Sequence, residues 1–299
     1  MARPALIVIT GPTGVGKTDV AISVAQRLGA EIISADSRQI YRHIPICTAA
    51  PTAEQLALVP HHFVQMLELD AYYSAAQFEA DALAKIQELH ARGHRYVVMC
   101  GGSMMYVDAV CRGIDDLPTI SDAVRRDVAL TFSRYGLEPL LEELQRLDPA
   151  YYAAIDRQNT KRVMHAVEIC REAGVPYSSL RTGAAKPRPF DIVKIGLDLP
   201  REQLFERINR RVELMLDHGL LDELRPLLPL RHLNALNTVG CKEIFAYFDG
   251  TWDLPTAVAR LQKNTRVYAK KQLTWYRRDP SITWLPPDPA AALSCILSD

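Results

Sequence analysis

Gly11-Pro12-Thr13-Gly14-Val15-Gly16-Lys17-Thr18 is the stretch of sequence that decides the fold. It matches the pattern GxxxxGK(S/T), follows the apolar run Ala5–Thr10 and opens an amphipathic run, Thr18–Leu28. A glycine-rich turn between a buried strand and a helix points backbone N–H groups at one anion, and the helix N-terminus adds a partial positive charge. The stretch therefore predicts a P-loop that binds a phosphate or pyrophosphate, with Mg²⁺ held at the Thr18 hydroxyl.

The rest of the chain repeats this alternation of strand and helix. Further strands are predicted at Glu31–Ser34, Tyr96–Cys100, Ile192–Leu197 and 282–285, and long amphipathic helices at residues 74–91, 200–218 and 254–276. Strands that alternate with helices favour a parallel sheet covered on both faces. We therefore expect an α/β fold, a P-loop NTPase-like parallel sheet with helices on both faces.

The alternation stops in the middle of the chain. Residues 117–189 show helical periodicity only, with predicted helix starts at Ser121 and Asn159 and a stop at Gly174. We interpret this segment as an all-helical insertion domain. The predicted domains are a P-loop core, residues 1–116 and 190–299, and the insertion, residues 117–189.

Composition narrows the class of protein without identifying a partner. The chain has 299 residues, and its 35 basic residues balance 35 acidic ones. The six cysteines are scattered without a CxxC pair, which is typical of reduced thiols rather than of a zinc site. Neither a signal peptide nor an apolar run long enough to cross a bilayer is evident, so we expect a cytoplasmic protein that does not bind a membrane.

The position of one acidic residue restricts the chemistry. The strand Tyr96–Cys100 ends in Cys-Gly-Gly, without the acidic residue that a P-loop hydrolase uses to hold Mg²⁺. Asp36 instead follows the second strand, and parallel strands place their carboxyl ends at the ligand-binding edge of the sheet. Asp36 is therefore a candidate base toward a nucleophile, although an aspartate at this spacing also suits a turn or a helix cap.

Basic residues suggest two further functions. Arg207 and Arg211 lie one helical turn apart beside an apolar stripe, where they could bind pyrophosphate or form a solvated face. Residues 254–278 contain seven basic and no acidic residues, with aromatic residues among them. Such a stretch favours contact with a nucleic-acid backbone over an ordinary solvated face.

Six motifs together resemble the bacterial tRNA dimethylallyltransferases, the IPP transferase family. The resemblance covers nearly the whole chain and keeps the family's motif order. The motifs are residues 11–18, Ser34–Tyr41 followed by Thr48-Ala-Ala-Pro51, Gly101–Tyr106, Arg157–Glu168, Asn237–Glu243, and Gln262–Arg266 followed by Lys270–Trp275.

The resemblance implies a donor, an acceptor and a metal. The donor is dimethylallyl pyrophosphate, the cofactor is Mg²⁺, and the acceptor is the adenosine 3′ of the anticodon in tRNAs that read codons beginning with U. It also implies that Asp36 accepts a proton from the adenine 6-amino group and that Thr13 contacts the donor. We further expect a monomer.

The same resemblance implies a set of site residues. The implied catalytic residues are Asp36, Thr13, Lys17, Arg207 and Arg211, and residues 11–18 bind the donor. The implied tRNA-binding residues are Asp36, Ser37, Arg38, Gln39, Ser103, Arg125, Gln158, Asn159, Thr160, Lys161, Arg162, Gly240, Cys241, Lys242, Arg266 and Lys270.

Two cysteines depart from the family's pattern. Cys47 stands where the family commonly has glycine, and Cys241 stands where it commonly has tyrosine. Both lie in segments that the resemblance places near tRNA, so they bear on the affinity for tRNA more than on the reaction.

Three other functions fit parts of the sequence. A small-molecule kinase also combines a P-loop, an aspartate after the second strand and a helical lid, and it would bind ATP. A prenyltransferase acting on free adenine nucleotides would not need the basic stretch. An RNA-binding module switched by a nucleotide would not need Asp36.

Overall fold

The computed structural model describes residues 3–298 and divides the chain into two compact units. One unit comprises the residues up to Cys111 together with those from Arg188 onward, and the other is Arg112–Pro187. We call them the core unit and the insertion unit.

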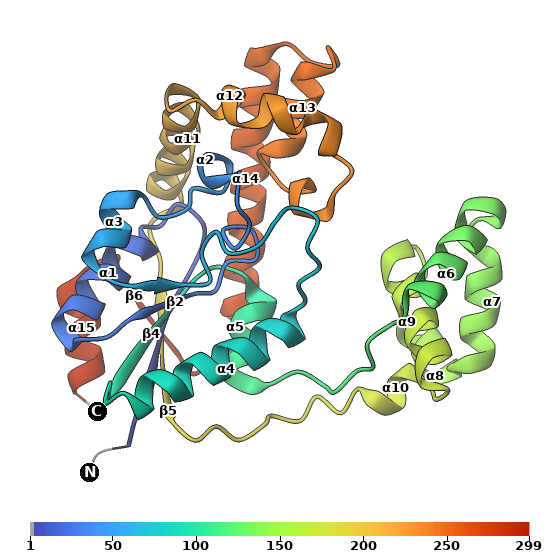
Figure 1. The fold of residues 1–299 in the computed structure, drawn as a ribbon, viewed down its shortest axis with the longest axis horizontal. Coiled ribbons are helices and arrows are strands. Elements are labelled where there is room, and N and C mark those ends of the chain that lie inside the picture. Colours follow the sequence, from blue (N-terminus) through green and yellow to red (C-terminus); the bar gives the residue numbers. More distant parts are fainter. Residues whose placement is uncertain (1–2, 299) are drawn as a thin grey trace. The chain divides into compact units, whose positions relative to one another are not determined.

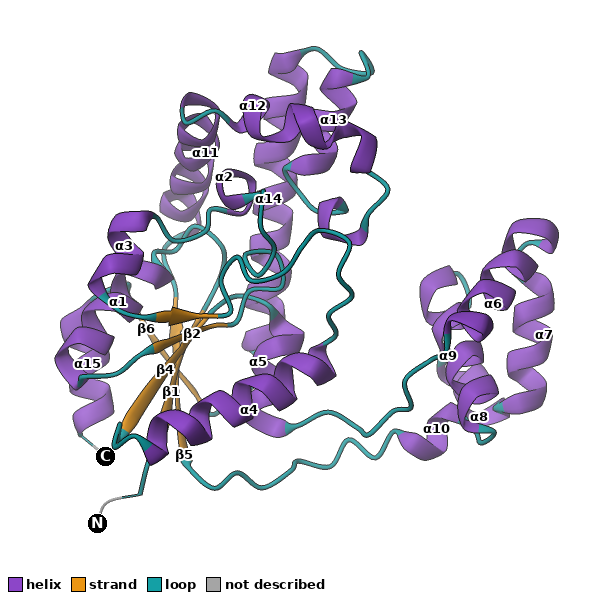
Figure 2. Cartoon of the chain, in the orientation of Figure 1, coloured by secondary structure: helices purple, strands orange, loops and turns teal. Residues whose placement is uncertain are grey.

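A six-stranded parallel sheet forms the centre of the core unit (Figure 2). The strand order is β3-β2-β4-β1-β5-β6. The predicted α/β fold class is confirmed, and the short edge strand β3 was not predicted from the sequence. The strands are β1 Ala5–Thr10, β2 Ile32–Ser34, β3 His61–His62, β4 Tyr96–Cys100, β5 Asp191–Leu197 and β6 Ile282–Leu285.

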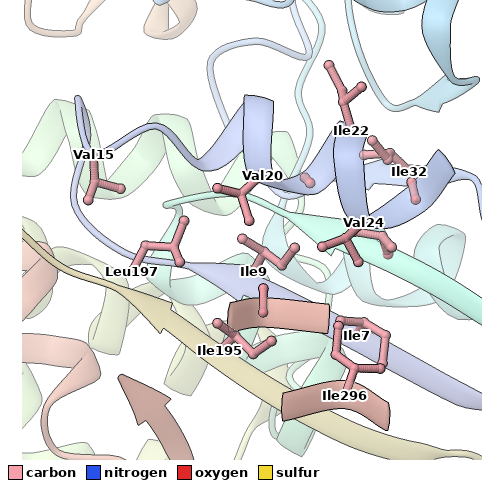
Figure 3. Close-up of a cluster of buried hydrophobic side chains, with 14 of the residues drawn as sticks. Ile7, Ile9, Val15, Val20, Ile22, Val24, Ile32, Ile195, Leu197 and Ile296 are labelled. Atoms are coloured by element: carbon pink, nitrogen blue, oxygen red, sulfur yellow. The ribbon is translucent and has the colours of Figure 1, made fainter. Parts of the chain in front are cut away.

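Helices cover both faces of this sheet because its central strand is apolar on both sides. Ile7 and Ile9 of β1 pack toward helices α1, α11 and α15, whereas Leu6 and Val8 pack toward α4 and α5. Figure 3 shows the first of these clusters. Successive side chains of a strand point to opposite faces, so a fully apolar run is what a doubly covered strand requires.

The helices of the core unit follow the chain as Figure 1 labels them. No helix in residues 3–298 is both long and apolar enough to span a membrane. The α-helices are α1 Lys17–Leu28, α2 Pro45–Thr48, α3 Ala53–Leu58, α4 Ala75–Ala91, α5 Met104–Arg112, α11 Arg201–Asp217, α12 Leu220–Leu224, α13 Cys241–Phe248, α14 Leu254–Tyr276 and α15 Pro289–Leu297.

The insertion unit is helical. Its helices are α6 Asp122–Tyr135, α7 Glu138–Leu147, α8 Pro149–Ala154, α9 Thr160–Ala173 and α10 Tyr177–Leu180. Ser121 and Asn159 cap α6 and α9 through their side chains, and Gly174 ends α9, as the sequence predicted. The unit has an apolar core of its own, in which Val128, Leu140 and Val163 are fully buried.

One glycine sets how closely the ends of β2 and β4 approach each other. A Cβ atom on Gly101 would lie 2.1 Å from the carbonyl oxygen of Ala35. The backbones are joined here, because the N–H of Ala35 donates to the carbonyl of Cys100 at 2.8 Å and that of Ser103 to Ala35 at 3.1 Å. The residues that follow β2 and β4 are thereby held together.

We predict that Gly101→Ala costs about 3 kcal/mol of stability, the upper end for overpacking, because the added methyl meets backbone that cannot rotate away. Gly93→Ala is the matched control: Gly93 has φ 94°, but a Cβ there meets no atom within 4 Å. The control should cost about 1 kcal/mol, from backbone strain alone. The measurement is the free energy of unfolding in urea, and equal losses in the two variants would contradict the close approach.

Candidate active site

The P-loop leaves β1, lines one end of a cavity and enters α1. Gly11, Gly14 and Gly16 have φ values of 139°, 84° and 100°, which side chains rarely tolerate. Gly11 also lies against β5, since a Cβ there would be 2.5 Å from the carbonyl oxygen of Leu197. The loop thus needs glycine both for its conformation and for its contact with the sheet.

Lys17 lies folded over this loop. Its Nζ donates to the carbonyl oxygens of Gly11 at 3.1 Å and Pro12 at 2.9 Å. The pKa of Lys17 is lowered to about 8, mainly by burial and also by the nearby Arg211, while Cys100 and Asp36 oppose the shift. An ammonium group that is poorly solvated gains strongly from an anion in contact with it.

A buried glutamine on α14 fixes the P-loop backbone. Gln272 Oε1 accepts a hydrogen bond from the Thr13 N–H at 2.8 Å, and its Nε2 donates to the carbonyl of Gly102 at 2.8 Å. Our sequence analysis did not select Gln272 individually. The helical spacing could have identified it, because Gln272 lies in line with Ala269 and Tyr276 on the buried face of α14. A polar side chain on such a face needs hydrogen-bond partners.

The two arginines of α11 contact the P-loop in different ways. Arg211 Nη2 donates to Thr13 Oγ1 at 2.7 Å, whereas Arg207 Nε donates to the carbonyl of Gly14 at 3.0 Å. Arg207 is exposed and Arg211 is half-buried. Burial lowers the pKa of Arg211, an effect that Asp36 partly offsets. The Arg211 Nε has no hydrogen-bond partner within residues 3–298, and a bound anion would supply one.

Asp36 both shapes a turn and faces the cavities. Its Oδ1 accepts hydrogen bonds from the N–H groups of Arg38 at 2.9 Å and Gln39 at 3.2 Å. The turn role that the sequence allowed is therefore present. The carboxylate also lies on the wall of both cavities described below.

The residues that follow Asp36 are tied to neighbouring segments. Ser37 N–H donates to Ser103 Oγ at 2.8 Å, which joins the ends of β2 and β4. Arg38 donates to the carbonyl of Asn234 at 2.7 Å. Gln39 Nε2 donates to the carbonyl of Ala49 at 2.9 Å. The polar segment after β2 is therefore held in place before any ligand binds.

Two cavities meet beside Asp36. The larger, about 800 Å³, extends from the P-loop along α2, α3 and α11, and the smaller, about 340 Å³, opens between Ser37, Thr48 and Lys242. The residues that line both are Thr13, Asp36, Thr48, Arg211, Met215 and Tyr268. One end of the combined space is suited to an anion, and the other is lined by the segments that we expect to contact tRNA.

The other predicted tRNA-binding residues lie in three places. Gly240, Cys241 and Lys242 form the start of α13; the Cys241 side chain is fully buried, whereas Lys242 is exposed. On α14, Lys270 is exposed and Arg266 donates to Asn209 Oδ1 at 2.5 Å. In the insertion unit, Arg125 lies on α6, Gln158 precedes α9, Asn159 caps it, and Thr160, Lys161 and Arg162 form its first turn.

The chemistry around Thr18 fits Mg²⁺ bound together with a substrate. Residues 3–298 contain no group of three or more His, Cys, Asp or Glu side chains that could hold a metal. Mg²⁺ usually keeps several waters and takes substrate phosphate oxygens, with only one or two protein ligands. Thr18 lines the larger cavity together with Asp19 and Asp36, so a hydroxyl and carboxylates are present at the anion site.

Curated relatives resemble the chain over nearly its full length. It is 54% identical over 293 residues to tRNA dimethylallyltransferase 2 of Parabacteroides distasonis, covering 98% of each chain. It is 55% identical over 283 residues to tRNA dimethylallyltransferase 2 of Porphyromonas gingivalis, covering 95% of this chain and 94% of the relative.

Solved structures share the fold. A tRNA isopentenylpyrophosphate transferase from Bacillus halodurans aligns with a TM-score of 0.70 and 35% identity over 99% of this chain and 95% of its own. A eukaryotic dimethylallyltransferase, described as acting on tRNA, aligns with a TM-score of 0.82 and 25% identity over 97% of this chain and 76% of its own. The sequence model of the IPP transferase family matches residues 39–279. With the P-loop, the parallel sheet and these relatives in agreement, the chain belongs to the IPP transferase family.

Proposed function

We propose that this chain transfers the dimethylallyl group from dimethylallyl pyrophosphate to the 6-amino group of the adenosine 3′ of the anticodon in tRNAs that read codons beginning with U. The observation that carries this proposal is the position of Asp36. Its carboxylate lies where a cavity built around a P-loop meets a second cavity. A donor pyrophosphate and an acceptor amine can therefore approach one carboxylate from two sides.

The reaction needs stabilisation of negative charge at one end. The adenine nitrogen forms a bond to the allylic carbon while the carbon–oxygen bond to pyrophosphate breaks, so charge develops on the leaving oxygens. The P-loop N–H groups, Lys17 and Arg211 surround the place where that charge develops. Fixed donors in a site shielded from water stabilise such charge more effectively than mobile solvent does.

At the other end a proton must leave the amine. We propose that Asp36 accepts this proton, because its Oδ1 already accepts from two N–H groups while its Oδ2 accepts no hydrogen bond from residues 3–298. The product is an N-alkylated adenosine, pyrophosphate and a protonated carboxyl group, so atoms and charge balance.

Mg²⁺ is the proposed cofactor, with Thr18 as the protein ligand at the P-loop. When bound, it would supply further positive charge to the pyrophosphate oxygens. The remaining charge stabilisation comes from Lys17 and Arg211, which are part of the chain itself.

The acceptor base must leave its stack to reach Asp36. Enzymes that act on a base usually extrude it and hold it with polar side chains. We assign Ser37, Gln39 and Ser103 to this step because they line or support the wall beside Asp36. The exposed cations of α14 and of the insertion unit would contact the phosphate backbone. Because the acceptor is tRNA, we place the reaction in the cytoplasm.

We predict that Asp36→Asn lowers the rate of transfer to tRNA by about 10²–10⁴-fold, the usual contribution of a general base. The amide oxygen can still accept from Arg38 and Gln39, so the turn is preserved. The measurement is single-turnover transfer of labelled dimethylallyl, with donor affinity measured in parallel. Asp70→Asn, a change at an exposed aspartate in the loop before α4 and outside both cavities, is the control and should transfer at a rate close to that of the native chain. Equal rates for Asp36→Asn and the native chain would exclude Asp36 as the base.

We predict that Arg211→Gln weakens use of the donor more than Arg207→Gln does. Arg211 is half-buried, donates to Thr13 and has an Nε that finds no partner in residues 3–298. Arg211→Gln should therefore lower kcat/KM for dimethylallyl pyrophosphate by about 10- to 100-fold. Because Arg207 is exposed, Arg207→Gln should lower the same kcat/KM by about fivefold or less. Steady-state kinetics at saturating tRNA measures both. The reverse order would show that Arg207 is the main anion ligand.

We predict that donor affinity falls as the pH rises above about 8. Lys17 is charged below its pKa of about 8 and loses its positive charge above it, and a bound pyrophosphate would restore the proton. Calorimetry above that pH, in buffers of different ionisation enthalpy, should therefore show proton uptake on binding. Lys17→Ala should bind weakly at all pH values and lack this proton uptake. Unchanged uptake in that variant would assign the titration to another group.

A further inference from the structure

The two cysteines at which the chain departs from the family's pattern lie against each other. Cys47 Sγ on α2 and Cys241 Sγ at the start of α13 are 3.1 Å apart, although 194 positions separate them in the sequence. Both side chains are buried, with exposures of 7% and 0%. The neighbouring Gly240 makes room for them, since a Cβ there would lie 2.6 Å from Cys47 Sγ.

Carboxylates hold the backbone on both sides of this pair. Glu223 accepts hydrogen bonds from the N–H groups of Ile46 and Cys47, each at 2.7 Å. Glu243 accepts from the Gly240 N–H at 2.8 Å. The two thiols are therefore presented to each other by fixed segments, and bonding at about 2.0 Å requires a shift of about 1 Å.

Cys47 of this pair also borders the smaller cavity. Cys47 and Thr48 line one side of it, and Val239 and Lys242 line another. A small oxidant that enters this cavity would meet Cys47 first, because Cys241 does not line the cavity and is fully buried. The hydrogen-bonding contact with the Cys241 thiol and burial raise the pKa of the Cys47 thiol, so the reaction should be slow and should favour a small, uncharged oxidant.

We propose that Cys47 and Cys241 form a reversible disulfide that controls the acceptor side of the active site. The oxidant class is a peroxide. Cys47 is oxidised to a sulfenic acid with release of one water, and the Cys241 thiol displaces the second water to form the disulfide. The two thiols together lose two electrons and two protons, and a dithiol restores them.

The consequence for activity rests on the function proposed above. Gln39, which follows the proposed base, donates to the carbonyls of Thr48 and Ala49 at the end of α2. A disulfide between Cys47 and Cys241 would shift α2 toward α13, and with α2 the wall that an extruded base must pass. Entry of the tRNA should be hindered, while the P-loop is left as it is.

The test treats the reduced chain with hydrogen peroxide and measures three quantities. Mass spectrometry of the digested chain should find a peptide pair that joins Cys47 to Cys241. The kcat/KM for tRNA should fall by about fivefold or more and recover with dithiothreitol, while donor affinity stays the same. Thiol titration should show that peroxide removes two thiols from the native chain. Cys47→Ser and Cys241→Ser should not show this loss of a thiol pair.

Each variant is compared with itself before and after peroxide, so its basal activity does not enter the comparison. Cys295→Ser, a change in α15, is the control and should keep both the cross-link and the response. The proposal is overturned if no Cys47–Cys241 peptide pair forms, or if it forms without a change in kcat/KM for tRNA. A reduced chain that transfers nothing would contradict the proposed function instead, and the cross-link would still be measurable.

Discussion

The structure depends on the gathering of positive charge at the carboxyl edge of the sheet before any anion is bound. Burial lowers the pKa of both Lys17 and Arg211. Arg211 also lies close enough to Lys17 for its positive charge to lower the pKa of Lys17. Asp36 opposes both shifts. Desolvated cations cost free energy in the empty site, and an anion in contact with them recovers it. Such a site favours a multiply charged anion, and this preference supports the pyrophosphate donor that we propose.

The order of the strands brings the segments of this site together. The P-loop after β1, the polar segment after β2 and the glycine pair after β4 all lie at one edge because the three strands are parallel neighbours. Gly101 permits the close approach of β2 and β4, and Gln272 joins the P-loop to Gly102. Residues far apart in the sequence thus form one wall of the site. Asp36 lies on this wall, where the larger and the smaller cavity meet.

Much of this could be predicted from the sequence, since local signals were strong. The P-loop pattern, the apolar strand Ala5–Thr10, the caps Ser121 and Asn159 and the long helix α14 all depend on neighbouring residues. The pairing of Cys47 with Cys241 and the bridging role of Gln272 could not be predicted, because each depends on distant segments brought together by the sheet. The sequence also left Arg207 and Arg211 equivalent, and only their burial and contacts distinguish them.

The most direct measurement is the transfer of radiolabelled dimethylallyl from its pyrophosphate to unmodified tRNA in the presence of Mg²⁺, followed by nuclease digestion to locate the label. We expect the label on the 6-amino group of the adenosine 3′ of the anticodon, with one pyrophosphate released for each group transferred. Unlabelled tRNA, together with ATP-dependent phosphorylation of a small molecule, would contradict this account and favour a kinase.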